Sequence, residues 1–273
     1  MNTQPFQLGD VPWGDTEMVE AYPEFKEVYA RKPVSDNTGG MKAPHAFLTW
    51  FMLSRLKPDL IVESGVYKGQ GTWLIEQACP SARLICLDIN FGTLTYRSKT
   101  ADYIERDFSL IDFTSEDLSN ALCFIDDHQN ALMRLQQMKW KGFRQAIFED
   151  NYPVRFGDCY SLKHAASGAG FDAPPPPAKP LGKRLRAALA SDPLTDRLIE
   201  SVPANETHRR ELEQNLEVYY EGPPLFGAET TRWGDAWTGD AFPTKAPLFN
   251  ATSEDPLKSE ALDYTWMCYV RFK

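Results

Sequence analysis

The segment from residue 59 to residue 90 constrains the fold of this chain more than any other. It holds an apolar run at 60–62, a glycine-rich turn, a helical stretch at 72–78 that Pro80 ends, and a second apolar run at 83–87. Short apolar runs separated by a turn and a helix are typical of parallel strands buried on both faces. We therefore expect a strand–turn–helix–strand unit, joined by a right-handed crossover.

Two acidic residues follow the ends of these strands, Glu63 after the first and Asp88 after the second. Asp88 is placed to accept the hydroxyls of a ribose, and glycines in the turn allow a ligand to approach the backbone closely. The spacing Glu-x-Gly-x-x-x-Gly-x-Gly differs from the Gly-x-Gly-x-x-Gly of dinucleotide sites, and Glu63 would repel a phosphate. Glu63 suits a cation instead, such as the amino group of an amino-acid moiety. The alternative is a crossover that binds no ligand, but it gives no reason for the two acids.

The remaining pattern continues the alternation of strands and helices. Helices are expected at 20–30, 45–56, 130–141 and 206–215, and strands at 102–108, 121–125, 143–148, 216–220 and 264–272. This order predicts an α/β, doubly wound, mainly parallel sheet in one domain that spans residues 1–273. Residues 1–43 would form an N-terminal arm across the ligand site. Residues 152–205, which include four consecutive prolines, would form a lid-like insertion.

Acidic clusters close two successive strands of the predicted sheet. Asp126 opens the first cluster, with Asp127 and His128, and the second consists of Glu149, Asp150 and Asn151. Ligands of an open parallel sheet bind beyond the carboxyl ends of its strands. Carboxylates gathered there would repel one another unless a cation or shared protons compensated. Oxygen ligands of this kind suit Mg²⁺ or Ca²⁺.

The first segment resembles motif I of the class I S-adenosylmethionine-dependent methyltransferases. The resemblance implies their Rossmann-like sheet, in which residues 264–272 would form the antiparallel last strand. It also makes S-adenosylmethionine the expected cofactor. An acid at Asp107, after the third strand, could bind the adenine amino group, and the alternative is a solvated charge. The expected cofactor-binding residues are Glu63, Gly65, Tyr67, Gly69, Thr72, Asp88 and Asp107.

The acidic clusters resemble the metal site of the cation-dependent O-methyltransferases. Residues 63–69 and 148–150 are also similar to the cephalosporin hydroxylase family and to macrocin-type O-methyltransferases. The resemblance implies that Asp126 and Asp150 bind a divalent cation, most simply Mg²⁺, with Glu149 or Asn151 as the third ligand. The lysine that serves as base in the catechol-type pattern is replaced here by Gln129. His128 is the expected substitute, and its alternative role is a helix-start residue bonded to the backbone or to Asp127.

The composition limits the partners. A formal charge of −9 argues against binding to nucleic acid or to an anionic membrane surface, because a protein that binds either of them needs a basic face. The five cysteines are dispersed, without a Cys-x-x-Cys pair, which favours a reducing compartment. With no secretory leader or membrane span in the pattern, we expect a cytoplasmic protein. The sequence leaves the oligomeric state open, a homo-oligomer included.

The expected function is a metal-assisted O-methyltransferase, with Asp126 and His128 as catalytic residues, that acts on a small polar hydroxylated metabolite. Two alternatives remain at this stage. One is a non-catalytic S-adenosylmethionine-binding or regulatory protein on the same fold, which the missing lysine favours. The other is a metal-dependent hydrolase or hydroxylase-like enzyme.

Overall fold

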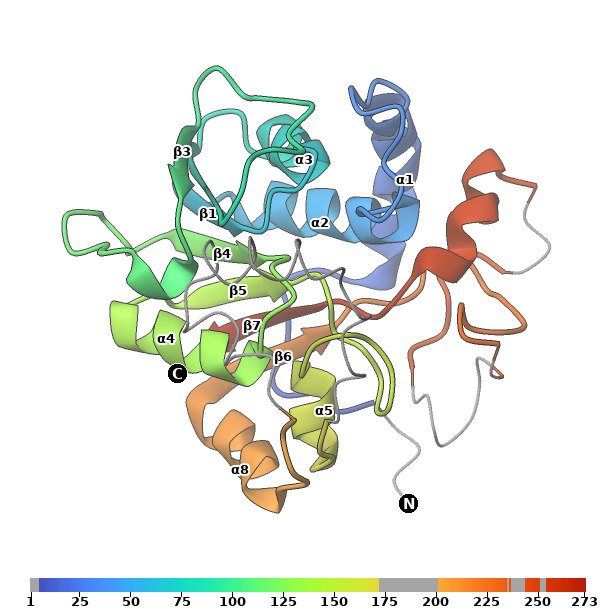
Figure 1. Ribbon diagram of the computed structural model, residues 1–273. Coiled ribbons are helices and arrows are strands. Elements are labelled where there is room, and N and C mark those ends of the chain that lie inside the picture. Colours follow the sequence, from blue (N-terminus) through green and yellow to red (C-terminus); the bar gives the residue numbers. More distant parts are fainter. Residues whose placement is uncertain (1–4, 172–200, 235, 237–243, 251–253) are drawn as a thin grey trace, which may run out of the picture.

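A computed structural model describes residues 5–171, 201–234, 236, 244–250 and 254–273 (Figure 1). Its sheet has the strand order β3-β2-β1-β4-β5-β7-β6. The strands are β1 (Leu60–Ser64), β2 (Arg83–Asp88), β3 (Asp102–Glu105), β4 (Ala121–Ile125), β5 (Gln145–Phe148), β6 (Leu216–Glu221) and β7 (Cys268–Phe272). The neighbouring strands along the row β3-β2-β1-β4-β5 pair in parallel, whereas β7 is antiparallel to both of its neighbours, β5 and β6. The predicted fold class is confirmed, including the antiparallel last strand.

Helices cover both faces of this sheet. In Figure 1, α1, α2 and α3 lie over one face, and α4, α5 and α8 lie over the other. The helices are α1 (Asp15–Tyr29), α2 (Ala43–Leu56), α3 (Gln70–Ala78), α4 (Ala131–Lys141), α5 (Leu162–Ser167) and α8 (Glu206–Asn215), with short 3-10 helices η1 (Phe108–Leu110) and η2 (Pro256–Asp263). None of the described helices is long and apolar enough to cross a membrane.

Alternate residues of the central strands serve two hydrophobic cores. In β1, Ile61 packs in the core beneath α1, α2 and α3, whereas Leu60 and Val62 pack in the core beneath α4 and α5. All five residues of β1 are buried. This burial explains why the strand reads as a continuous apolar run and not as an alternating one.

Two segments that the sequence pattern set apart are packed structure instead. Part of the predicted arm, residues 15–29, forms α1, which buries Met18 and Phe25 in the core; the ring of Phe25 lies 5.2 Å from that of Phe47. In the predicted insertion, residues 162–167 form the buried helix α5. That the insertion acts as a lid stays a prediction. Residues 172–200, with the four prolines, lie outside the described residues.

The carboxyl edge of the parallel strands places the residues that follow them in one row. The backbone N–H of Gly65 donates to Leu87 at 2.9 Å, that of Asp126 donates to Ser64 at 2.8 Å, and that of Glu149 donates to Ile125 at 2.9 Å. Each bond continues the hydrogen-bond ladder one residue past the strand end. The glycine-rich turn and both acidic clusters consequently lie side by side at this edge.

Candidate functional site

The glycine-rich turn requires glycine at two of its positions. Gly65 has φ +90°, and a Cβ atom there would lie 1.9 Å from the carbonyl oxygen of Asp126. Gly69 has φ +84°, and its Cβ would lie 2.1 Å from the carbonyl oxygen of Tyr96. Both residues adopt the left-handed conformation that glycine takes without a steric cost. The turn can therefore pass between β1 and α3 only with glycine at these positions.

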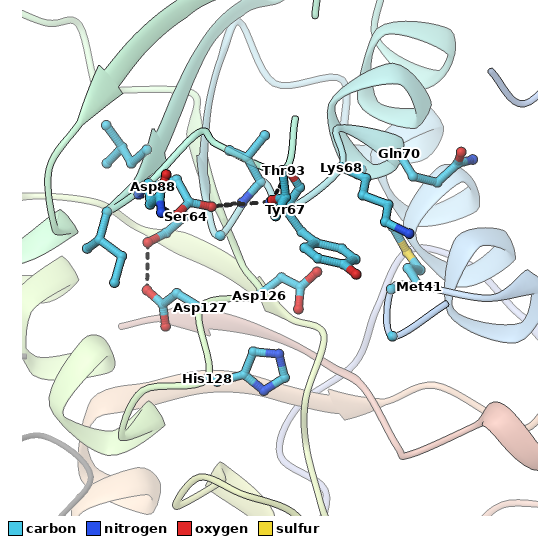
Figure 2. Close-up of a pocket in the computed structure, with 18 of the residues that line it drawn as sticks. Met41, Ser64, Tyr67, Lys68, Gln70, Asp88, Thr93, Asp126, Asp127 and His128 are labelled. Atoms are coloured by element: carbon cyan, nitrogen blue, oxygen red, sulfur yellow. Dashed lines mark hydrogen bonds between the residues drawn. The ribbon is translucent and has the colours of Figure 1, made fainter. Parts of the chain in front are cut away.

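Asp88, at the end of β2, holds the turn and faces a cavity. Its Oδ2 accepts the backbone N–H groups of Val66 at 2.9 Å and of Tyr67 at 3.2 Å, and its Oδ1 accepts the N–H of Asn90 at 3.0 Å. A carboxylate offers about four acceptor positions, so capacity for a ligand hydroxyl remains. Figure 2 shows Asp88, Tyr67 and Asp126 lining the same space.

This first cavity, called the cofactor cavity below, has a volume of about 440 Å³. Such a volume falls in the range of small-molecule sites. Several buried polar atoms of its lining have no hydrogen-bond partner among the described residues, namely Nε2 and Oε1 of Gln70, Oδ1 of Asn37 and Oε1 of Gln129. Buried polar atoms without partners are costly, and a polar ligand would satisfy them. The lining therefore fits a polar small molecule.

Glu63 and Thr72 lie beneath the turn and not in the lining of the cavity, contrary to the prediction. Glu63 is 1% exposed, and its Oε2 accepts the Thr72 hydroxyl at 2.5 Å. Burial raises the pKa of Glu63 to about 8, although the hydrogen bonds from Thr72 and Cys86 oppose this. The other oxygen, Oε1, has no partner, and a Cβ atom on Gly71 would lie 2.5 Å from it. Glu63 thus reaches the cavity wall only through the bare backbone of Gly71.

Asp107 lines the cofactor cavity, but its carboxylate is already engaged. Oδ1 accepts Nη1 of Arg134 at 3.0 Å, Oδ2 bonds Nη2 of the same guanidinium, and the N–H of Ser109 donates to Oδ1 at 2.8 Å. Arg134 is 1% exposed and also donates Nε to Asp127 at 2.9 Å. This buried pairing gives Asp107 a structural role, and its contact with adenine stays a prediction.

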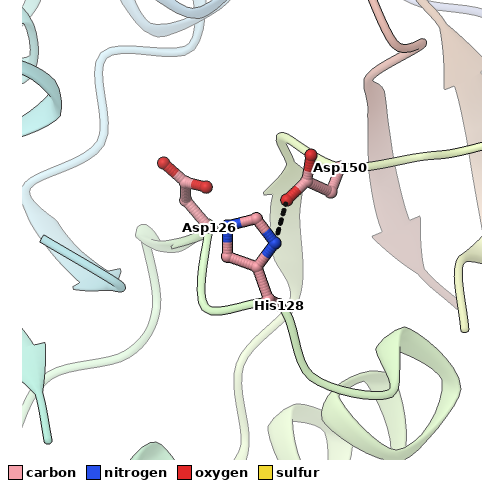
Figure 3. Close-up of side chains that lie close together, drawn as sticks. All are labelled: Asp126, His128 and Asp150. Carbon is pink, nitrogen blue, oxygen red and sulfur yellow. Dashed lines mark ion pairs between the residues drawn. The ribbon is translucent and has the colours of Figure 1, made fainter. Parts of the chain in front are cut away.

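A second cavity, called the acceptor cavity below, adjoins the first and contains a candidate metal site. Ligand atoms of Asp126, His128 and Asp150 lie within 4.8 Å of one another (Figure 3). Burial, followed by the charges of Glu149 and Asp150, raises the pKa of Asp126 well above its usual range. Carboxylates in this state gain from a bound cation. Two carboxylates and an imidazole suit a divalent metal ion, so the cluster fits one.

His128 belongs to this cluster, and its charge contradicts its predicted role as base. Nδ1 lies 3.0 Å from Oδ1 of Asp158 and 3.2 Å from Oδ2 of Asp150, the latter within ion-pair distance but not aligned for a hydrogen bond. Burial would lower the pKa of His128, yet the bond to Asp158 and the charges of Asp150 and Asp126 outweigh it and raise the pKa to about 11. An imidazolium can neither accept a proton nor bind a metal. His128 would serve as a ligand only by releasing this proton to an incoming cation.

Glu149 and Asn151, the two predicted third ligands, have other partners. His45 on α2 places Nδ1 at 2.5 Å from Oε1 of Glu149, while its Nε2 accepts the N–H of Thr265 at 2.9 Å. Because Nε2 accepts, the neutral ring carries its proton on Nδ1 and donates it to Glu149. Asn151 is fully buried, with its amide bonded to the Tyr219 hydroxyl at 2.8 Å and to the N–H of Lys163 at 2.8 Å. Asn151 is thus removed from the metal cluster.

Sequence reasoning missed His45, Arg232 and the role of residues 37–41. Asn37, Gly39, Gly40 and Met41 line the cofactor cavity, and the last three also line the acceptor cavity. The Tyr67 hydroxyl donates to the carbonyl of Thr38 at 2.9 Å and ties this segment to the turn. These residues belong to the predicted N-terminal arm and lie at both cavities.

Comparisons with known proteins reach only distant similarities. No family model and no curated protein matches the chain. TomG, an O-methyltransferase from Streptomyces achromogenes in complex with SAM, is 12% identical over 52% of this chain and 66% of its own, with a TM-score of 0.34. The SAH-bound Podospora anserina methyltransferase PaMTH1 is 11% identical over 96% and 89%, with a TM-score of 0.42. The plantazolicin methyltransferase BpumL is 13% identical over 95% of each chain, with a TM-score of 0.41. Similarities this distant assign neither activity nor substrate.

Proposed function

We propose that this protein is an S-adenosylmethionine-dependent O-methyltransferase that acts on a small polar hydroxylated acceptor with the help of a divalent cation. One observation carries the proposal. The cofactor cavity and the acceptor cavity share a wall made of Asp126, His128 and residues 39–41. A ligand in each cavity would thus meet the other beside the candidate metal cluster, which is the proximity that group transfer needs.

Residues of the turn would hold the cofactor. Asp88 would accept the ribose hydroxyls, and Gln70 and Asn37 would bond polar atoms of the ligand with the groups that now have no partner. The bare backbone at Gly71 would bring a cationic amino group towards Glu63 Oε1. Tyr67, 39% exposed, would cover the ligand as part of the cavity lining.

Asp126, His128 and Asp150 would hold the cation. A bound cation would lower the pKa of an acceptor hydroxyl, and a bound S-adenosylmethionine would supply the methyl group. Because His128 must be neutral to bind a metal, it would give up its proton on loading. Its hydrogen bond to Asp158 would then fix the orientation of the ring.

Glu149 would accept the proton of the acceptor hydroxyl. It lines the acceptor cavity beside the candidate metal cluster, and a cation bound there would offset the neighbouring negative charges and favour the ionised form of Glu149, which can accept a proton. The neutral His45 donates to Oε1 and orients the carboxylate. Glu149 would thus serve as the base in place of the lysine of the catechol-type pattern, whose position Gln129 occupies here. It would also take the role that the sequence pattern suggested for His128.

The test is transfer of a labelled methyl group from S-adenosylmethionine to a panel of hydroxylated metabolites, with Mg²⁺ and with a chelator. Asp150→Asn should abolish turnover and leave calorimetric cofactor binding unchanged. Glu149→Gln should lower kcat by about 10²- to 10⁴-fold, the usual contribution of a general base. Glu217→Gln, on the surface beside Arg271, is the matched control. Full activity in chelator would contradict the role of the cation. The absence of calorimetric binding heat with both S-adenosylmethionine and its demethylated product would contradict the methyltransferase function.

A further inference from the structure

The acceptor cavity is acidic, yet it contains cations besides His128. Its volume is about 100 Å³, and its acids are Asp126, Glu149, Asp150 and Asp263. Among the described residues that line it, the other cations are Lys42 and Arg232. The Lys42 side chain already has a partner in the protein, because its Nζ donates to the carbonyl of Asn37 at 2.8 Å.

Arg232 differs from most arginines of the described part of the chain that neighbour acids. Arg83, Arg134, Arg209 and Arg271 each form an ion pair with a carboxylate. Among the described residues, no carboxylate lies within ion-pair distance of the Arg232 guanidinium, although the cavity it lines holds four of them. Two of these acids are paired elsewhere, Glu149 with His45 and Asp150 with His128. The Arg232 guanidinium lies over the Trp233 ring, 5.9 Å from its centroid, so its charge has an aromatic contact but no carboxylate partner among the described residues.

The backbone of Arg232 is anchored, so its side chain starts from a fixed point beside the acceptor cavity. Thr231 is 2% exposed, and its carbonyl accepts the N–H of Gly234 at 2.9 Å. Trp233 stacks on Phe156, with ring centroids 4.6 Å apart, and on Trp266 at 6.5 Å. The Arg232 side chain itself is exposed. An exposed guanidinium on an anchored turn presents a planar fork of donors, which matches carboxylate and phosphate oxygens.

We propose that Arg232 recognises an oxyanion, a carboxylate or a phosphate, on the methyl acceptor. This inference rests on the proposed function and narrows its substrate class to hydroxylated acids or phosphorylated hydroxyl compounds. In a protein of formal charge −9, an anionic acceptor is repelled unless a cation stands at its site. Arg232 supplies that cation beside the metal cluster, so the hydroxyl would face the cluster while the oxyanion faces the guanidinium.

Small oxyanions that fit the acceptor cavity serve as probes in place of the acceptor itself. Acetate, its neutral isostere acetamide, and inorganic phosphate are titrated into the full chain loaded with S-adenosylhomocysteine and Mg²⁺. Calorimetry and the emission of the tryptophans next to Arg232 report binding. The variants are Arg232→Gln, Arg232→Lys, and Arg144→Gln as the control, because Arg144 is also exposed but lines neither cavity.

We expect acetate or phosphate to bind saturably and acetamide not to bind. Arg232→Gln should weaken oxyanion binding by about tenfold to a hundredfold, the range for a charge-assisted hydrogen bond. Arg232→Lys should restore part of the affinity, and Arg144→Gln should change nothing. The stronger of the two oxyanions identifies a carboxylate or a phosphate acceptor.

Several outcomes would overturn the inference. These are no binding of either oxyanion, binding unchanged in Arg232→Gln, or binding that depends on Mg²⁺ but not on Arg232. Each leaves the proposed function standing if S-adenosylhomocysteine still binds the same sample. Loss of that cofactor heat in the unmodified chain would instead sink the proposed function.

Discussion

Glu63, buried beneath the glycine-rich turn, makes the stability of the protein depend on pH. The pKa of its carboxyl rises from 4.5 to about 8 on folding, mainly because of burial. Since the folded pKa is higher, this group stabilises the protein fully below about pH 4.5, and the contribution is lost as the pH rises through about 8. We expect Glu63→Gln, which mimics the protonated form, to remove this dependence. The loss between these pH values is on the order of 4 kcal/mol.

The measurement is urea unfolding of both proteins at several pH values between 5 and 8. Wild type minus Glu63→Gln isolates this group from all others that titrate. The difference in unfolding free energy should decrease steadily as the pH rises. A flat difference would mean that Glu63 is ionised in the folded protein.

At the scale of helices and strands, Arg134 connects several elements through buried ion pairs that stabilise the folded protein. From α4, its guanidinium binds Asp107, before η1, and Asp127, after β4, and Asp127 in turn accepts the Ser64 hydroxyl of β1 at 2.6 Å. Arg134→Met should cost about 3–5 kcal/mol of unfolding free energy, because it leaves buried carboxylates without a counter-charge. Arg209→Met on α8 removes an exposed pair with Glu213 and should cost less than about 1 kcal/mol. Denaturant midpoints and slopes give both values, and equal losses would contradict this account.

The strands were predictable from the sequence because their burial leaves a local pattern. The run at 121–125 is β4 without any change in bounds, and the glycine turn after β1 lies where its spacing put it. Helix α5 could not be predicted, because six residues give too little periodicity. The strand expected over 264–272 begins only at Cys268. The aromatic residues before it, Tyr264 and Trp266, are buried as core and not as strand.

Within the candidate site, the sequence predicted which residues gather but not which residues pair. Asp126 and Asp150 were placed at one sheet edge by topology alone, and the structure brings them together with His128. His45 pairs with Glu149 across 104 residues, and Asn151 pairs with Tyr219 across 68. No local pattern reports such distant partners. For this reason the roles of Glu149, Asn151 and His128 required the structure.

At the scale of the whole molecule, two adjoining cavities predict two ligands whose effects can be separated. A ligand that binds only the folded state stabilises it by about 2.7 kcal/mol at a hundredfold its Kd. S-adenosylhomocysteine and Mg²⁺ should therefore each raise the unfolding temperature of the wild-type chain.

Variants of the two cavities should separate these responses. Asp88→Asn should weaken the binding of S-adenosylhomocysteine by about 1–3 kcal/mol and keep the response to Mg²⁺, because Asp88 lines only the cofactor cavity. Asp150→Asn should lose the response to Mg²⁺ and keep that to S-adenosylhomocysteine, because Asp150 lines only the acceptor cavity. Thermal unfolding of the three proteins with each ligand measures this, and a variant that lost both responses would show that the cavities form one site.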